Sequence, residues 1–320
     1  MSTLSVEGPP ALTIDEGAVQ GRTPWQLFWA RFKQDRLAFF GLALIGMMVV
    51  LALIAPLIAS LTGHGPNETF TSVKDAFGLP KGPNGEFLLG ADAAGRDVLV
   101  RLAYGARVTL LVGIIASGIA LVIGVTLGLV AGYIGGWVDT LISRAGDVVL
   151  SLPLVVFALG IVAACSTSEE GCLGGSLKPG LLLVIIIIAL FSWPSPARLV
   201  RGATLSLREK EFVEAARALG AKERTIMFRE ILPNLIAPIV VYGSLLIPAS
   251  VLFESYLSFL GLGVPGDTPS WGKMLAESIG IFRVAWWFWL FPGLFLMLTV
   301  LAFNLLGDGL RDALDPRTGR

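Results

Sequence analysis

The chain has 320 residues, of which 54% are hydrophobic and only 15% charged, and its mean hydropathy is +0.76. Soluble proteins carry about 25% charged residues, so this composition excludes an ordinary soluble domain and indicates a membrane protein. Lys and Arg total 24, as do Asp and Glu, so the net charge gives no indication of nucleic-acid binding.

The chain begins with a polar segment, residues 1–23, for which we expect a disordered tail. An amphipathic helix is predicted over 24–36. Four aromatic residues there follow the i, i+3, i+4, i+7 spacing of one helix face: Trp25, Phe28, Trp29 and Phe32. Such a helix is typical of the lipid headgroup layer, and packing on a partner subunit is the alternative.

Six nearly uncharged runs are long enough to cross a hydrocarbon layer roughly 30 Å thick as helices. They are Leu37–Leu61, Val108–Val138, Val148–Cys165, Pro179–Ala197, Ile231–Phe253 and Val284–Gly307. The first run begins too late and is too long for a cleavable signal peptide, so we expect 37–61 to remain as the first transmembrane helix. The fold class predicted is therefore all-α, a polytopic membrane protein with six spans.

The positions of the basic residues predict the orientation. With both termini in the cytoplasm, 16 of the 24 Lys and Arg residues lie inside and 8 outside, which follows the positive-inside rule. Segment 62–107 is then external, irregular at first and ending in an amphipathic helix from Arg96 to Arg107 that pairs Asp97 with Arg101. Segment 308–320 becomes a cytoplasmic tail.

A charged stretch, 198–230, separates the fourth and fifth predicted spans and carries two amphipathic helical patterns. The first runs from Glu211 to Leu219, and its apolar residues share one face: Phe212, Ala215, Ala216 and Leu219. Gly220 permits a left-handed helix end, and a second short helix is expected from Lys222 to Glu230. A paired amphipathic fold at the membrane surface predicts a binding partner.

Part of this stretch resembles the cytoplasmic motif of the membrane subunits of ATP-binding cassette importers. That motif is Glu-Ala-Ala, three residues, Gly, nine residues, Ile, one residue, Leu-Pro. Glu214-Ala215-Ala216, Gly220 and Leu232-Pro233 fall on this spacing, whereas Glu230 occupies the Ile position and Ile231 follows it.

The resemblance extends over about residues 25–317 and is closest to the dipeptide/oligopeptide/nickel permease group, in its second type with an extra N-terminal span. The strings that carry it are Leu89-Gly90-Ala91-Asp92, Gly95-Arg96-Asp97-Val98, Tyr104-Gly105-Ala106-Arg107, Leu257 to Gly263, Pro269-Ser270-Trp271-Gly272, Asn304 to Asp312 and Asp315-Pro316-Arg317.

This resemblance implies a five-helix importer core, 108–307, preceded by one N-terminal span. It implies a bacterial inner-membrane permease that imports dipeptides or short oligopeptides by alternating access, with nickel chelates or glutathione as alternative substrates. The implied partners are a second permease, two ATPase subunits that bind ATP and Mg, and an external solute-binding protein. The residues implied to couple to the ATPase are Glu214, Ala215, Ala216, Arg217, Leu219, Gly220, Leu232 and Pro233.

Other residues are candidates for a gate or a covalent link at the outer face. Glu254 would contact a peptide or the binding protein, or else mark where the fifth span leaves the lipid. The run that follows would dip in as an external gate or form an interfacial cap; its candidate residues are Leu257, Phe259, Gly261 and Gly263. Cys165 and Cys172 are spaced for a disulfide or are two free thiols.

Three charged residues and four tryptophans have simpler interpretations. Asp139, Arg144 and Asp147 are expected in a tight inner turn, paired with one another or with lipid headgroups. The tryptophans are expected in interfacial belts: Trp271, Trp286, Trp287 and Trp289.

The sequence argues against an enzyme. The only Gly-Lys pair, Gly272-Lys273, lacks the pattern of a phosphate-binding loop, so no cofactor is expected in this chain. His64 is the sole histidine and lies in the outer loop, which argues against a histidine-built metal centre or an intramembrane hydrolase. An ion-coupled secondary transporter would need ionisable residues in mid-span, and the six runs lack them.

Overall fold

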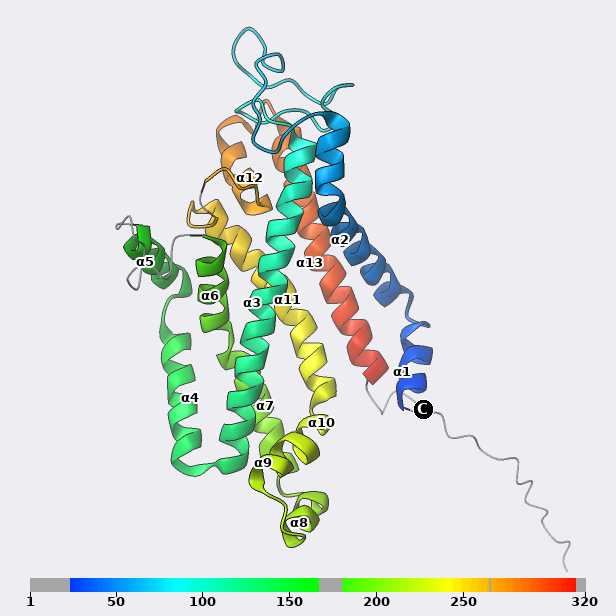
Figure 1. Cartoon of the computed structure of the whole chain (residues 1–320), viewed down its shortest axis with the longest axis vertical. Helices are drawn as coiled ribbons and strands as arrows, with labels where there is room; N and C mark the ends of the chain where they lie inside the picture. Colours follow the sequence, from blue (N-terminus) through cyan, green and yellow to red (C-terminus); the bar gives the residue numbers. More distant parts are fainter. Residues whose placement is uncertain (1–23, 167–179, 265, 315–320) are drawn as a thin grey trace, which may run out of the picture.

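The computed structural model describes residues 24–166, 180–264 and 266–314, and in this part of the chain the only β-type pairing is two isolated bridges, Lys74 with Pro80 and Ala91 with Asp97. The predicted tail 1–23 lies outside the described residues. The rest is a helix bundle with an irregular cap, residues 63–97, at one end (Figure 1). The all-α prediction is confirmed.

Five helical segments are long and apolar enough to cross a membrane, and a sixth is counted if one bent pair forms a single span. The five are α2 (Arg36–Thr62), α3 (Val98–Ile134), α6 with α7 (Leu181–Ser192 and Pro194–Leu207), α11 (Ile236–Phe259) and α13 (Trp286–Leu314). The short helices are α1 (Pro24–Phe32), α8 (Glu211–Ala218), α9 (Glu223–Thr225), the π-helical turn η1 (Ile226–Ile231), α10 (Leu232–Asn234), α12 (Trp271–Ser278) and the 3-10 turn η2 (Ile279–Ile281).

The predicted third span is the bent pair. Helices α4 (Gly136–Ser151) and α5 (Leu154–Ser166) meet at 84°. Pro153 explains the break, because it has no N–H to continue the helix and disfavours helical backbone at the residue before it. The tight turn expected around Asp139, Arg144 and Asp147 is therefore wrong, since all three residues lie within α4.

Helix α3 is longer than predicted because Asp97 starts it early. The Asp97 carboxylate accepts hydrogen bonds from the backbone N–H groups of Leu99 and Val100, so the expected external helix is the first turns of α3 itself. The predicted pairing of Asp97 with Arg101 is wrong. Asp97 binds His64 at 2.7 Å, while Arg101 points to Glu277.

Helix α13 also continues past the predicted boundary at residue 307 and ends at Leu314. Phe32 of α1 is buried against Ala38 and Ala313, with Phe28 packed alongside, so the aromatic face of α1 covers the end of α13 (Figure 1). Trp29 stays 41% exposed. The apolar residues that α1 covers explain why the polar sequence after residue 307 remains helical.

Helices α3 and α7 pack at backbone distance through three glycines spaced four residues apart, Gly124, Gly128 and Gly132. A Cβ added at Gly128 would lie 2.4 Å from the carbonyl oxygen of Ala197, and one at Gly132 would lie 2.8 Å from that of Arg201. Small residues at this spacing let two membrane helices approach closely. This glycine stripe fixes α7 against the longest helix of the bundle.

The N-terminal span is held to the core by Arg107 of α3. Pro56 in α2 has no N–H, which leaves the carbonyl oxygen of Ala52 without its helical partner. The guanidinium group of Arg107 donates to that oxygen and, at 3.2 Å, to the carbonyl oxygen of Leu53. A charged side chain thus replaces the missing backbone donor.

We predict that Gly128→Leu destabilises the bundle, because the new side chain would overlap the backbone of α7. Overpacking of this kind costs about 1–3 kcal/mol. The check is resistance of the purified protein to unfolding by SDS. Gly118→Leu is the matched control, since Gly118 lies on the same helix with nothing within 4 Å of its Cβ position. Equal stability of the two variants would contradict the stripe's role.

We predict that Arg107→Ala costs about 1 kcal/mol, the scale of hydrogen bonds between membrane helices. The loss should shrink when Pro56→Ala is added, because that substitution restores the backbone N–H that the carbonyl of Ala52 lacks. A double-mutant cycle on SDS unfolding measures this coupling. Strictly additive effects would show that Arg107 does not substitute for the missing donor.

Candidate functional site

Residues 210–234, here named the α8 hairpin, form the end of the molecule opposite the irregular cap (Figure 1). Its first arm is α8. Glu211 and Glu214 lie in the first turn, where negative charge favours the helix dipole. The helix ends because Gly220 takes a left-handed conformation, with φ of +78°.

The turn after α8 is fixed by two backbone hydrogen bonds. The N–H of Gly220 donates to the carbonyl of Arg217 at 2.9 Å, and the N–H of Ala221 donates to that of Ala216 at 3.0 Å. This pair of bonds is a Schellman motif, which favours glycine at its left-handed position. The prediction that Gly220 ends the first helix is confirmed.

The second arm consists of α9, η1 and α10 and carries the apolar residues that anchor the hairpin. Ile226 and Ile231 are almost completely buried, and they pack with Val213 of α8 against Leu129 and Val200 on α3 and α7. The hairpin is therefore a rigid extension of the α3–α7 pair rather than a loose loop.

Only one narrow face of α8 is used for this packing. Val213 is fully buried and Ala216 is partly buried against the same cluster. The residues predicted to share an apolar face do so, but the structure leaves most of that face uncovered: Phe212 is 37% exposed, Leu219 is 87% exposed, and Ala215 is also exposed. An apolar surface on a helix so well fixed is suited to contact with another protein.

The remaining predicted coupling residues lie on both sides of the turn. The guanidinium group of Arg217 stacks over the ring of Tyr133, 5.5 Å from its centroid, which joins α8 to the end of α3. Leu232 is partly buried in the same cluster, whereas Glu214 and Pro233 are exposed. Sequence analysis had not identified Tyr133 or Val213 as residues that hold the hairpin.

The opposite end of the bundle is held by buried ion pairs. Glu277 of α12 accepts from Arg96 at 2.7 Å and from Arg101 at 2.8 Å, and Asp92 of the cap accepts from Arg96 at 2.6 Å. Burial lowers the pKa of nearby Lys273, Glu277 opposes this shift, and Arg101 adds to it. The network joins the cap, α3 and α12.

The tryptophans at this end divide into two pairs. Trp271 and Trp287 are buried, and their indole N–H groups donate at 3.0 Å to the carbonyls of Leu102 and Ala91. The expectation of interfacial belts is wrong for these two, because the cap and α12 cover them. Trp286 and Trp289 are 51% and 41% exposed, as an interfacial position requires.

The predicted gate segment is the end of α11 rather than a separate re-entrant segment. The N–H of Leu262 bonds to the carbonyl of Leu257 and that of Gly261 to Ser258, a second Schellman cap, with φ of +80° at Gly261. Within that last turn Leu257 is buried and Phe259 is exposed. A gating role for these residues stays a prediction.

Glu254 does not mark the end of its helix, and its carboxylate is fully buried. It accepts hydrogen bonds from Ser258 at 2.6 Å and Ser255 at 3.4 Å. Gly263 packs directly on Ser258, where a Cβ would lie 1.9 Å from the hydroxyl oxygen. Glu254 therefore has no surface at which to meet a peptide in this conformation.

The remaining candidates concern cysteine and metal chemistry. Cys165 is buried near the end of α5, and Cys172 lies outside the described residues, so the link between them stays a prediction. Over residues 24–166, 180–264 and 266–314, no group of three His, Cys, Asp or Glu side chains could hold a metal ion. The candidate site is therefore a contact surface rather than a reaction centre.

Comparison with known proteins identifies two family models. Residues 124–320 match the binding-protein-dependent transport system inner membrane component, and residues 23–77 match the N-terminal TM domain of oligopeptide transport permease C. The second match spans α1, α2 and the start of the cap, the part that precedes the importer core.

Individual relatives agree with these families. The chain is 42% identical to the dipeptide transport system permease protein DppC of Alkalihalophilus pseudofirmus, over 92% of this chain and 90% of that one. It is 41% identical to the glutathione transport system permease protein GsiD of Escherichia coli, over 93% and 92%. A chain of the inward-facing MetNI methionine ABC transporter shares the fold, with a TM-score of 0.55 and 20% identity over 67% of this chain and 96% of that chain.

The matched domains, the relatives covered over nearly their full length and the shared fold agree with the multi-helical bundle and its exposed hairpin. The chain belongs to the binding-protein-dependent transport system inner membrane components and is a multi-pass permease of the dipeptide and oligopeptide group of ATP-binding cassette importers.

Proposed function

We propose that this chain forms half of the translocation pathway of an importer for dipeptides or short oligopeptides. The permease named for dipeptides and the one named for glutathione, itself a short peptide, are almost equally similar to it, which supports a peptide substrate. Nickel chelates and glutathione remain the alternatives. ATP-dependent uptake of each solute by the reconstituted complex is the experiment that separates them.

The α8 hairpin is the surface that receives the ATPase subunit. The observation that carries this proposal is the apolar face that α8 leaves exposed, formed by Phe212, Ala215 and Leu219. Because Val213 and the Schellman turn fix α8 to α3 and α7, a push on this face moves the bundle instead of bending a loop. Two such ATPases would bind ATP and Mg, and this chain would be a non-catalytic subunit without a cofactor.

The α8 end would face the cytoplasm, together with both termini. The cap and α12 would then face outward, where a solute-binding protein delivers the peptide between this chain and a second, similar permease. ATP binding would close the ATPase pair, and the α8 hairpin would carry that motion into the helices so that the pathway opens outward. Hydrolysis would reset it.

An ion-coupled secondary transporter is the rival mechanism. The buried carboxylate of Glu254 is the one observation in its favour, since ionisable residues in spans often mark ion pathways. Uptake into vesicles loaded with ATP or supplied with a proton gradient distinguishes the two mechanisms. Uptake that follows the proton gradient and ignores ATP would refute the importer assignment.

We predict that Leu219→Arg abolishes uptake while the protein still inserts and assembles, because the substitution places a charge in the proposed apolar contact and Leu219 is 87% exposed in the free chain. Uptake and ATP hydrolysis by the reconstituted complex provide the measurement. Leu219→Met is the control and should retain transport. Unchanged uptake by the Arg variant would place the ATPase contact elsewhere.

We predict that a cysteine at Glu214 reacts with a membrane-impermeant thiol reagent only in inside-out vesicles, and a cysteine at Glu86 only in right-side-out vesicles. Both side chains are exposed, at opposite ends of the molecule, so a difference in access reports orientation. A background with serine at positions 165 and 172 removes the native thiols. The reverse labelling pattern would invert the proposed topology.

A further inference from the structure

We propose that α4 is a hinged strut that moves with α7 because the ion pair between Asp139 and Arg201 joins them. The proposal rests on the proposed function, in which the α8 hairpin receives the push of the ATPase. It adds a second route for that push, from α7 into α4 and onward to the bent α5.

Both ends of α4 are places where the backbone can pivot. At its start, Gly135 and Gly136 have φ of +71° and +58°, conformations that favour glycine, and Gly135 alone separates α4 from α3. At its end, Pro153 interrupts the helical hydrogen bonds and α5 leaves at 84°. A rigid rod between two such points needs a lateral attachment to follow another helix.

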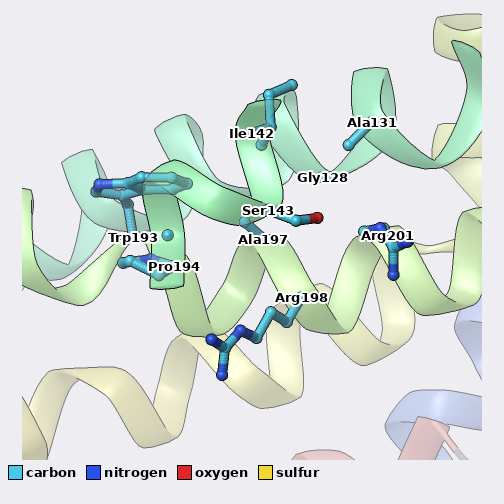
Figure 2. Close-up of a pocket in the computed structure, with 10 residues that line it drawn as sticks. Gly128, Ala131, Ile142, Ser143, Trp193, Pro194, Ala197, Arg198 and Arg201 are labelled. Carbon is cyan, nitrogen blue, oxygen red and sulfur yellow. The ribbon is translucent and has the colours of Figure 1, made fainter. Parts of the chain in front are cut away.

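Packing provides little of that attachment. Trp137, Leu141 and Val148 of α4 are 76%, 61% and 60% exposed. On the side that faces α7, a pocket separates Ile142 and Ser143 of α4 from Pro194 and Ala197 of α7 (Figure 2). Close glycine packing like that between α3 and α7 is missing from this part of the interface, where a Cβ at Gly146 would still lie 3.4 Å from Pro194.

The ion pair supplies the attachment. Both carboxylate oxygens of Asp139 accept from Arg201, Oδ1 from Nε and Oδ2 from Nη2 at 2.6 Å, and the Ser143 hydroxyl lies 3.2 Å from Oδ1. Asp139 is only 17% exposed and Arg201 is 36% exposed. A two-point bond with restricted water access is stronger and more directional than the exposed pair of Asp147 and Arg198 nearby.

The position of Arg201 connects this bond to the hairpin. It lies two turns before the end of α7, and only three residues, 208–210, separate α7 from α8. Arg208 donates to the carbonyl of Gly132 at 3.1 Å, so the end of α3 is tied to the same segment. A displacement of α8 therefore reaches α3 through glycine contacts and α4 through Asp139.

The test compares Asp139→Asn and Arg201→Gln with the native chain in the reconstituted transporter. We expect uptake per ATP hydrolysed to fall about two- to thirty-fold, the effect of one link in a coupling network. Arg144→Gln is the control, because Arg144 is 79% exposed and reaches Asp147 only at 3.9 Å. Native coupling in both variants, with Leu219→Arg still inactive, would overturn the strut while leaving the proposed function intact.

A covalent replacement separates a mechanical role from a merely structural one. Asp139→Cys and Arg201→Cys are combined in the background with serine at 165 and 172, and the two thiols are joined by a short bifunctional reagent. We expect weak coupling before the linker is added and recovered coupling afterwards. If the linked protein transports no better, or if it loses transport that the unlinked protein has, α4 does not travel with α7.

Discussion

The contact between α3 and α7 is the constraint on which the remaining arrangement depends. Because Gly124, Gly128 and Gly132 have no side chains, the two backbones touch over two helical turns. Helix α3 is the longest in the bundle, so this contact places α7, and with it the α8 hairpin, at a fixed position relative to α2, α6 and α11. Without it, the hairpin would have no rigid base.

Charged side chains are used where backbone or helix ends would otherwise lack partners. Arg107 binds the carbonyl that Pro56 leaves free, Asp97 caps α3, and the pairs of Arg96 and Arg101 with Glu277 fasten α12 to the cap. Each bond joins elements distant in sequence. Burial of these groups is tolerated because almost every one has a partner, which keeps the cost of removing charge from water low.

The two ends of the molecule consequently differ in how they are stabilised. The end with the cap is held by buried tryptophans and ion pairs, which leave few exposed apolar side chains on α12. The end with the α8 hairpin is held by one apolar cluster and leaves Phe212 and Leu219 uncovered. An exposed apolar face on a rigid element is unfavourable for an isolated chain, and contact with a partner removes that cost.

The sequence by itself determined the number and length of the apolar segments, the position of the α8 hairpin and the turn at Gly220, because these follow from local composition and backbone preference. The four-residue glycine repeat was also visible, although its partner was not. Only the tertiary structure decided that Val213 faces inward while Phe212 and Leu219 stay exposed, that the third span bends at Pro153, and that Asp139 binds Arg201 rather than its neighbours. Those outcomes depend on which helix faces lie together, and side chains 62 positions apart meet only after the helices have packed.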